Sequence, residues 1–577
     1  MAQRSATDVL VVGAGPVGLT AAVELRRRGV SCRIVDRLVE RLPFAKAVGI
    51  QPRTLEIWDR MGMVREALEA SVPLRGQLLY VNGAAEGRFD LVLPPEVPYG
   101  FAALPQFETE RILTGVLERS GGSIERGTEL VSFAQDSGGV TCRLVSAAGV
   151  EEELRVGYLV GCDGAHSAVR KGLGLSFEGG AFPEEYMLGD VEVDWDLPEG
   201  YTVRSSHLGP DGAVDDVLVC IPLPGRKRYR MSMTVPSELS VARRGGTGAG
   251  ADAGDGVAHG LEGGVAPALA DIQAVLDRLA PQPTTASALR WSSVFRISHR
   301  IVDRYGTGRV FVAGDAAHIH PPTGAQGMNT GIQDAWNLAW KLALAVEGAA
   351  APGLLASYDA ERRPVGEEVV GRTVRHATEG MEADMRDPAA MLLREAQLLV
   401  GYRGSPVVGP DEGPDAGPDA GAAAGPVGGP VGSGAYGDGP RPGDRAPDCG
   451  GLTSRIAAYP MRLYDVLRGR GHVLVLYDGG GGVDGGRADE LAEAARKLSG
   501  GRVEAFVVSG AGGGDGGLAG GTLLPVYRDA RGEFARLYGV AAGRVTAFVV
   551  RPDGYVGARV SRPGVAELRE YFAGVLG

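Results

Sequence analysis

The sequence predicts an α/β protein, in which a Rossmann-like domain is interleaved with a mainly antiparallel α+β insert and followed by a smaller α/β domain. The first observation is a βαβ unit, formed by the apolar run Asp8–Val12, the helical pattern Gly18–Arg28 and the strand Val30–Val35. The second is a later group of apolar or alternating segments with few helical signals, which is typical of an antiparallel sheet. The length of 577 residues also exceeds a single core and indicates several domains.

The first turn of the βαβ unit carries Gly13, Gly15 and Gly18, with Pro16 inside the same turn. Gly13 permits a tight turn, Gly15 lets the backbone approach a pyrophosphate, and Gly18 lets the helix pack closely on the strand. The helix N-terminus adds a partial positive charge. Asp36 follows the second strand, 18 residues after Gly18, where it can accept hydrogen bonds from ribose hydroxyls. The unit therefore predicts dinucleotide binding; a tight turn without a ligand is the alternative.

Two further patches of glycine and acid follow apolar strands, at Asp163–Ser167 and at Gly314–His318. Each marks a strand edge where backbone can approach phosphate or ribose closely. Three such patches in this order indicate FAD. The alternatives are a plain turn acid for Asp163 and a helix N-cap for Asp315, and the second is compatible with cofactor binding.

Composition and pattern also place the remaining boundaries. Stretches rich in Gly, Ala, Pro and Asp cannot bury enough apolar surface to fold, and they predict a flexible insertion and a linker. No cysteine follows Cys449, which argues against thiol redox chemistry in the last domain and favours packing or dimerisation. The predicted parts are a discontinuous FAD-binding domain at 1–185 and 285–400, a substrate-binding middle domain at 186–284 with the insertion 245–264, a linker at 404–443 and the C-terminal domain at 444–577.

Charge and cysteine usage restrict the partners. A net charge of −12 argues against nucleic acid and anionic membranes, because a phosphate surface requires a basic face. The five cysteines lie far apart and have no histidine at metal spacing, so no metal site is expected. No apolar run is long enough to span a bilayer. We expect a reduced, soluble, cytoplasmic protein that is a monomer or a homodimer.

Together, the three patches resemble those of FAD-dependent aromatic hydroxylases, the single-component flavoprotein monooxygenases of the para-hydroxybenzoate hydroxylase type. The resemblance is strongest to polyketide and phenol hydroxylases with a thioredoxin-like C-terminal domain, and it covers nearly the whole chain outside the low-complexity segments. It implies that Asp163, Gly164, Ser167 and Arg170 lie near the FAD pyrophosphate and the passing nicotinamide cofactor. It also implies that Gly314 and Asp315 hold the ribityl and ribose hydroxyls.

The resemblance assigns three more segments to the flavin. The glycine-rich helix start in Pro321–Asn329 would face the N1–C2=O edge, where reduced flavin carries negative charge. A loop between Arg41 and Arg53 would run along the ring, with Lys46 where relatives often have arginine. The segment 104–113 would reach FAD, unless it is an ordinary helix start. The predicted cofactor-binding residues are Gly13, Gly15, Pro16, Gly18, Asp36, Arg37, Lys46, Gln106, Arg111, Asp163, Gly164, Gly314, Asp315, Pro322, Gly324, Gly327, Met328 and Asn329.

The implied activity is hydroxylation of a phenolic, polycyclic aromatic substrate by NADPH or NADH, O₂ and FAD, through a flavin C4a-hydroperoxide. Lys46 and the 321–329 loop would gate movement of the flavin. No residue has the signature of a catalytic base, and we interpret His318 and His320 as structural hydrogen-bonding groups. The substrate pocket is expected from Leu188–Val193 and Val217–Leu223, facing Pro321 and Pro322.

The sequence leaves three alternatives open. The same motifs serve Baeyer–Villiger oxygenation of a polycyclic ketone. A flavin halogenase is disfavoured because the sequence has no Trp-x-Trp-x-Ile-Pro segment. A flavin-binding or partner-binding protein without turnover, using the last domain for docking, is the alternative outside catalysis.

Overall fold

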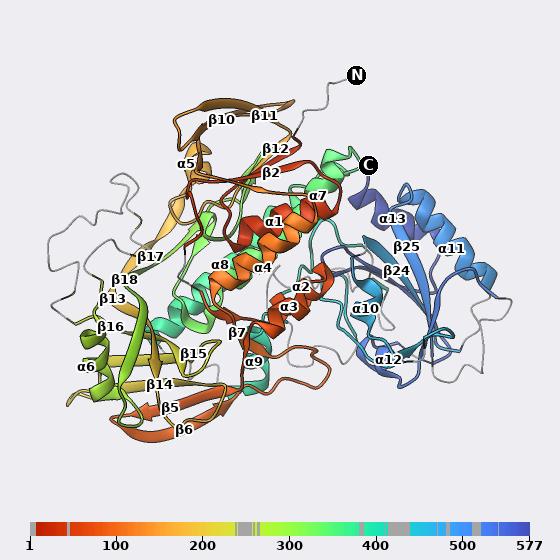
Figure 1. Ribbon diagram of the computed structural model, residues 1–577. Helices are drawn as coiled ribbons and strands as arrows, with labels where there is room; N and C mark the ends of the chain where they lie inside the picture. The colour runs from red at the N-terminus through yellow and green to blue at the C-terminus, as the bar shows by residue number, and fades with distance from the viewer. Residues whose placement is uncertain are drawn as a thin grey trace.

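The computed structural model describes most of the chain and arranges it in three packed parts. Figure 1 shows the Rossmann-like domain at the centre, the larger antiparallel sheet on one side and the C-terminal domain on the other. Lys46 and most of the predicted insertion and linker lie outside the described residues. The described residues are 7–42, 47–236, 239, 257, 260–261, 266–379, 386–409, 411–412, 439–457, 459–469, 471–480, 485–510, 521–540 and 542–577.

A six-stranded sheet forms the Rossmann-like domain, in the order β19-β20-β12-β1-β2-β8. All neighbours are parallel except β19 and β20, as the apolar runs predict for a sheet covered on both faces. This order places the carboxyl ends of β1, β12 and β20 side by side, and the three glycine patches begin there. The elements are β1 (Val9–Val12), β2 (Cys32–Asp36), β8 (Ile124–Arg126), β12 (Tyr158–Gly161), β19 (Gly306–Thr307) and β20 (Val310–Val312), with helices α1 (Pro16–Arg27), α4 (Gln106–Arg119) and α7 (Gly327–Val346).

A nine-stranded, mainly antiparallel sheet lies beside this domain, in the order β17-β18-β13-β16-β15-β14-β5-β6, with β21 paired to β18. One face packs on α6 (Leu269–Leu279) through Met187, Met231 and Met233. The other face lines a cavity. The strands are β5 (Gly76–Val81), β6 (Ala84–Asp90), β13 (Phe177–Val193), β14 (Tyr201–Leu208), β15 (Val214–Pro222), β16 (Arg228–Thr234), β17 (Gly260–Leu261), β18 (Ala286–Val302) and β21 (His318–Ile319).

This sheet extends beyond the middle segment 186–284 given by the sequence. The boundary at 186 falls inside β13, and β18 begins just after 284. β5 and β6 join from the first hundred residues, because β5 pairs in parallel with β14. A pattern read along the chain follows continuous segments, whereas a sheet edge is paired by whichever strand lies next to it in space.

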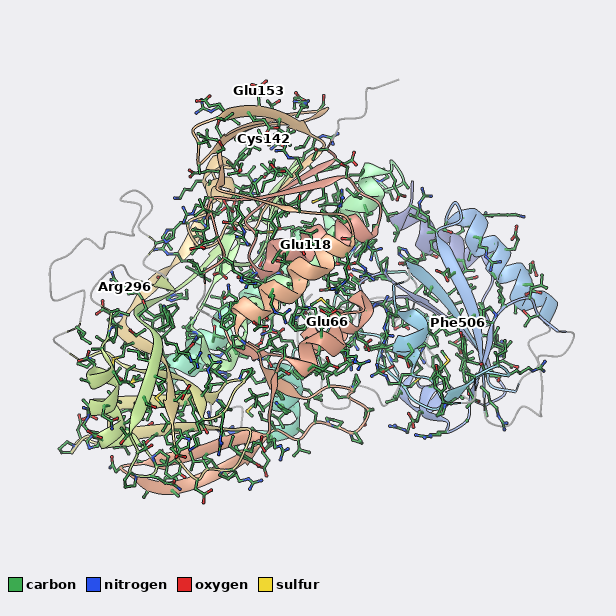
Figure 2. All side chains as sticks on the ribbon, in the orientation of Figure 1. Glu66, Glu118, Cys142, Glu153, Arg296 and Phe506 are labelled. Atoms are coloured by element: carbon green, nitrogen blue, oxygen red, sulfur yellow. The ribbon has the colours of Figure 1, made fainter. Side chains whose placement is uncertain are left out.

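Smaller elements complete the first two parts. An antiparallel sheet of three strands, which the sequence analysis did not anticipate, contains Cys142 and Glu153 at the top of the view in Figure 2. Helices α2 and α8 connect the centre to the C-terminal domain. The elements are β3 (Gly49–Ile50), β4 (Val72–Leu74), β7 (Phe101–Ala103), β9 (Thr128–Asp136), β10 (Gly139–Ser146), β11 (Glu151–Val156), α2 (Pro52–Met61), α3 (Val64–Glu69), α5 (Ala168–Gly172), α8 (Ser357–Glu379), α9 (Pro388–Glu395), and the 3₁₀ turns η1 (Gly314–Ala316) and η2 (Thr323–Ala325).

The C-terminal domain is a seven-stranded mixed sheet in the order β22-β28-β27-β24-β25-β26-β23, with a hydrophobic core on each face. The predicted strands at 472–477, 503–508 and 546–550 are confirmed as β24, β25 and β27; the thioredoxin-like description stays a prediction. The elements are β22 (Asp411–Glu412), β23 (Leu452–Thr453), β24 (His472–Asp478), β25 (Val503–Ser509), β26 (Val526–Asp529), β27 (Val545–Val550), β28 (Val556–Ser561), α10 (Leu463–Leu467), α11 (Gly485–Leu498), α12 (Glu533–Leu537) and α13 (Val565–Val575).

The C-terminal domain shares a core with the rest of the chain. Trp340 and Leu344 of α7 belong to the same hydrophobic cluster as Leu474 and Phe572. The turn between β27 and β28, residues 551–555, enters the central domain and contacts α2, α7 and α8 through buried hydrogen bonds. The two domains therefore pack as one body.

His472 gives a prediction for acid stability. It lies among Trp340, Tyr571 and Phe572, with ring centroids 5.4, 6.0 and 6.3 Å away. Burial, helped by Arg551, lowers the pKa of His472 to about 3. The unfolded chain, with an ordinary pKa near 6.5, binds this proton first, so stability present above about pH 6.5 is lost as pH falls toward 3. Between pH 7.5 and 5, wild type should lose about 2 kcal/mol more stability than His472→Phe in urea titrations.

The matched control is His207→Gln, because His207 is exposed on β14 beside Asp215. That variant leaves the buried imidazole of His472 and the rings around it in place. Equal slopes for wild type and His472→Phe would contradict the burial argument.

Candidate active site

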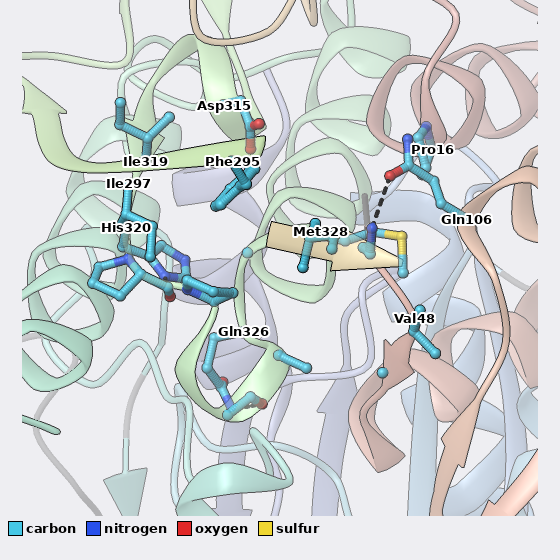
Figure 3. Close-up of a pocket in the computed structure, with 18 of the residues that line it drawn as sticks. Pro16, Val48, Gln106, Phe295, Ile297, Asp315, Ile319, His320, Gln326 and Met328 are labelled. Atoms are coloured by element: carbon cyan, nitrogen blue, oxygen red, sulfur yellow. Dashed lines mark hydrogen bonds between the residues drawn. The ribbon is translucent and has the colours of Figure 1, made fainter. Parts of the chain in front are cut away.

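A cavity of about 1560 Å³ lies between the carboxyl edge of the Rossmann-like sheet and the inner face of the nine-stranded sheet. Drug-sized ligands occupy about 300–1000 Å³, so this space is large enough for a dinucleotide and a second molecule. Figure 3 shows Pro16 and Gln106 on one side of it, His320 and Ile297 on the other, and Met328 between them. Of the predicted cofactor-binding residues, those that line it are Gly13, Gly15, Pro16, Asp36, Arg37, Gln106, Asp163, Gly164, Asp315, Pro322, Gly324, Gly327 and Met328.

The three glycines of the first turn differ in what surrounds them. Gly13 has φ +98°, and a Cβ there would lie 2.3 Å from the Cys162 carbonyl oxygen. A Cβ on Gly18 would lie 1.9 Å from the Gly13 carbonyl oxygen, so Gly18 lies beneath the turn and outside the cavity lining. A Cβ on Gly15 would meet nothing within 4 Å. Gly15 thus leaves open space at the N-terminus of α1, where a phosphate fits.

Asp36 lies at the end of β2 and faces the cavity. Its carboxylate accepts hydrogen bonds from the backbone N–H of Ala14 at 2.7 Å and of Leu38 at 2.8 Å, and Arg126 lies 3.6 Å away. A carboxylate has about four lone-pair sites, so it can accept ribose hydroxyls as well. Arg37 beside it is exposed and also lines the cavity.

The middle patch builds the corner between β12 and α5. Asp163 accepts hydrogen bonds from Ser167 Oγ at 2.5 Å and from the N–H groups of Ala168 and Val169, and burial raises its pKa. Arg170 is buried; its Nη1 donates to the Ala316 carbonyl at 3.3 Å. Arg170 therefore connects the middle patch to the third one, and it does not line the cavity.

The third patch is held from behind by Asp334 of α7. The Gly314 N–H donates to Asp334 at 3.1 Å, and the same carboxylate bonds His318 at 2.8 Å and Arg362 at 2.7 Å. Burial favours the neutral acid, but Arg362 and His318 outweigh it and lower the pKa of Asp334. Gly314 thus supports the turn from beneath, while Asp315 faces the cavity. The expected structural role of His318 is confirmed by its buried bond to Asp334.

Asn329 stabilises the glycine-rich loop through buried hydrogen bonds. Its Nδ2 donates to the carbonyls of Gly49 and Ala325 at 2.9 and 2.8 Å, and its Oδ1 accepts from the Gln51 N–H at 3.0 Å. It is fully buried and outside the cavity lining. Asn329 therefore holds the loop against β3, and its cofactor-binding role stays a prediction.

Helix α4 separates two residues that the sequence analysis grouped together. Gln106 lines the cavity, accepts the Ala47 N–H at 3.2 Å and donates to Glu110 at 2.9 Å. Arg111 is 53% exposed and pairs with Glu108 outside the cavity. Positions 106 and 110 share a helix face, whereas position 111 is turned by about 100° from 110. Glu110 is therefore the second residue of this helix in the lining.

Three further residues line the cavity that the sequence analysis did not predict as ligands: Gln51, His320 and Glu395. Gln51 Oε1 and His320 Nε2 are buried acceptors without a partner among the described residues. His320 Nδ1 donates to the Pro321 carbonyl at 2.9 Å, and burial lowers the pKa of His320 to about 3, so the ring is neutral. Two orphan acceptors fit a ligand with N–H or O–H donors, such as a flavin or a phenol. No motif or periodic spacing in the sequence marks these three residues as part of a binding site.

Glu395 packs against the glycine-rich loop at Gly324 and Gln326. Its carboxylate pairs with Arg372 and accepts Gln326 Nε2 at 2.9 Å. A Cβ on Gly324, which has φ +72°, would lie 2.3 Å from Glu395 Oε2. This contact fixes the turn that precedes α7.

Gly324→Ala should therefore lower kcat at least tenfold, because the methyl group must displace both the loop and the Glu395 carboxylate while φ is positive. Gly348→Ala is the matched control: Gly348 follows α7, has φ +71°, and a Cβ there would meet nothing within 4 Å. Steady-state turnover and FAD content measure the effect. Equal losses in both variants would show that backbone strain alone matters.

The turn at α1, the acid after β2 and the third patch under α7 together define a dinucleotide-binding α/β protein with a second sheet across the cofactor cleft. Among the described residues, no group of three His, Cys, Asp or Glu side chains is arranged for a metal ion, and no helix has the length and apolarity to cross a membrane. The FAD binding domain family matches residues 6–247 and 262–373, more than half of the chain.

Comparison with known proteins makes the assignment more specific. A flavin-dependent monooxygenase from Mycobacteroides abscessus is 33% identical over 480 residues, covering 81% of this chain and 88% of that protein. The 6-methylpretetramide 4-monooxygenase of Streptomyces rimosus is 38% identical over 369 residues, covering 63% and 61%. The crystal structure of aklavinone-11 hydroxylase with FAD and aklavinone matches with a TM-score of 0.73 at 26% identity, covering 100% of this chain and 98% of that one. The chain belongs to the FAD-dependent aromatic and polyketide monooxygenases.

Proposed function

We propose that this monooxygenase hydroxylates a phenolic, polycyclic aromatic substrate of polyketide type, using FAD, O₂ and NADPH or NADH. The observation that carries the proposal is a continuous cavity that extends from the glycine turn of α1 to the inner face of the nine-stranded sheet, called here the cavity floor. When bound, FAD supplies the transfer of electrons from the nicotinamide to O₂ and of one oxygen atom to the substrate.

The cavity floor supports a flat, largely apolar substrate. Side chains alternate along each strand, so Leu188, Val217, Val219 and Ile221 face the cavity, while Val191, Leu218 and Cys220 pack on the other face with α6. Only alternate residues of the predicted pocket segments thus reach it. Phe89, Phe295 and Ile297 add to the apolar surface, with Pro321 and Pro322 at the cofactor side. Such a surface suits stacked or edge contacts with fused aromatic rings.

The names of relatives agree with this substrate class. One acts on 6-methylpretetramide, and another was crystallised with aklavinone. For this chain the proposal extends only to the class of oxygenated, polycyclic aromatic substrates.

Residues around the loop have distinct proposed roles. The N-terminus of α7, at Gly327 and Met328, would stabilise negative charge on the reduced ring. The free acceptors of Gln51 and His320 would orient donor groups on the ring or the substrate. Asp36 would hold the adenosine ribose, and Gly15 would make room for the pyrophosphate. The apolar floor would exclude water from the reacting atoms.

Turnover of a polycyclic phenol panel tests the proposal. Purified yellow protein should consume NADPH or NADH faster with at least one polycyclic phenol, and the product should gain one oxygen on an aromatic carbon by mass spectrometry and NMR. A ring-expanded ester or lactone would indicate Baeyer–Villiger oxygenation, and chloride-dependent products would indicate halogenation. No stimulation by any aromatic compound would favour a binding protein without turnover. Gel filtration and fractionation test the proposals of a monomer or homodimer and of a cytoplasmic location.

A further inference from the structure

The inner face of the nine-stranded sheet carries one arginine that is anchored by a carboxylate. Arg230 of β16 lines the cavity, although only 3% of the residue is exposed. Its neighbours Met231 and Met233 point the other way, into the core with α6. The alternation of side chains along β16 therefore directs Arg230 toward the cavity.

Asp190 of β13 fixes the guanidinium. The two residues are directly opposite in the sheet register; Arg230 Nε bonds one carboxylate oxygen, and Nη2 donates to the other at 3.1 Å. Trp291, opposite Asp190 on β18, places its ring centroid 5.1 Å from Arg230 Cζ. A side-on carboxylate and an aromatic face hold the arginine in one orientation.

This arrangement leaves one end of the guanidinium free. Both contacts to Asp190 use Nε and Nη2, and Nη1 has no hydrogen-bond partner among the described residues. Nη1 is also absent from the side-chain atoms that are sealed from solvent without a partner. An arginine cannot lose its charge in a protein, so Nη1 presents permanent donors to the cavity.

The surroundings suit an oxygen-bearing ligand. Ser232 and Thr234 follow Arg230 on the same face of β16, and Ile221 lies opposite it on β15. Arg204 also faces the cavity, but its side chain is exposed and no carboxylate of the described chain anchors it. Arg230 is thus the more rigid donor on an otherwise largely apolar floor.

We propose that Arg230 is a specificity-determining residue that binds an anionic oxygen of the substrate, a carboxylate or an ionised phenol or enol, with Asp190 as its positioning residue. The inference rests on the proposed function for the identity of the floor as the substrate site. It adds that the preferred substrates carry an acidic oxygen beside the fused rings. A neutral aromatic of the same shape would leave Nη1 without a partner, which weakens binding.

Equilibrium binding to the FAD-loaded protein without nicotinamide tests this inference. The probes are a hydroxyanthraquinone carboxylic acid and its methyl ester, measured by isothermal titration calorimetry at pH 7.5. Wild type should bind the acid at least about tenfold more tightly than the ester, as one charge-assisted hydrogen bond allows. Arg230→Lys should lose most of this preference, because a point charge cannot bond Asp190 side-on and reach the ligand together.

A second variant guards against a folding defect. Arg230→Gln with Asp190→Asn removes both charges together, so no unpaired charge remains buried. It should bind acid and ester equally while keeping the wild-type flavin spectrum and FAD affinity. The control is Arg290→Gln: Arg290 of β18 pairs with Glu192 of β13, is exposed and lies outside the cavity lining. This control should keep the preference for the acid.

Three results would overturn the inference. Wild type could bind the acid and the ester equally, or the double variant could keep the preference for the acid. The double variant could also lose FAD while it binds both probes equally, which would assign Arg230 to the flavin. Binding needs no turnover. A failed turnover assay with an intact acid preference would therefore refute the proposed function and leave the Arg230 site in place.

Discussion

Asp553→Ala should lower the free energy of unfolding by about 3–5 kcal/mol, because it leaves a buried positive charge without compensation. Asp553 and Glu361 face Arg551 and Lys341, and none of the four side chains is exposed. The four charges cancel, so removing Asp553 leaves a net positive charge in the interior. Asp553 Oδ2 also accepts Trp340 Nε1 at 3.1 Å, a bond that the variant loses.

The same substitution tests the contact between the C-terminal domain and the Rossmann-like domain. Arg53 and Trp336 donate to the Asp553 backbone carbonyl, so the turn that carries Asp553 is bound to α2 and α7. We expect one urea transition in wild type and an earlier or split transition in Asp553→Ala. Glu490→Ala is the matched control, since Glu490 pairs with Arg487 on the exposed face of α11 and should change stability by less than about 0.5 kcal/mol. A loss below about 1 kcal/mol for Asp553→Ala would contradict the buried charge network.

Gly15→Val should weaken FAD binding by about 100-fold or more while the protein stays folded. A Cβ at this position would have no heavy atom within 4 Å, and Gly15 has φ −75°, which any residue adopts, so the backbone accepts the substitution. The valine side chain fills the space where the pyrophosphate would contact the N-terminus of α1. Loss of two hydrogen bonds to a charged group accounts for a change of this size.

FAD affinity is measured by flavin fluorescence on titration of the apoprotein, and folding by thermal unfolding of the same apoprotein. Gly87→Val on β6 is the control, because a Cβ there also meets nothing within 4 Å. It should leave FAD affinity unchanged. If Gly15→Val bound FAD within about threefold of wild type, less than 1 kcal/mol, the pyrophosphate would lie elsewhere.

The predicted glycine patches show which features of the candidate site can be predicted from local sequence. Gly13, Gly15 and Asp36 could be placed because a turn, a helix start and a strand end are set by residues a few positions apart. Gly18, Gly314 and Asn329 were assigned to the cofactor but lie behind the lining, where they keep the turns in shape. Sequence spacing identifies such residues as a group, but it does not separate those that face a ligand from those that support them.

Contacts between distant segments account for what the sequence analysis missed. Arg111 was grouped with Gln106, yet the face of α4 that meets the cavity carries Glu110. Gln51 and Glu395 reach the glycine-rich loop from distant segments, whereas His320 directly precedes it, and Gln51 bonds the Gly324 carbonyl at 2.6 Å. The pairing of β5 with β14 brings two strands from the first hundred residues, β5 and β6, into the nine-stranded sheet that lines the cavity. None of these neighbours leaves a periodic signal in the chain.

The sequence by itself determined the βαβ unit, the order of the three patches and the strands of the last domain, since apolar periodicity and glycine placement act over a few residues. Only the tertiary structure decided which face of each strand meets the cavity, which carboxylate anchors Arg230 and how the turn at Asp553 joins two domains. Those outcomes depend on packing and charge pairing between residues hundreds of positions apart, such as Arg53 and Asp553. Burial makes it costly to leave either partner of such a pair unpaired, and the folded chain alone creates the burial.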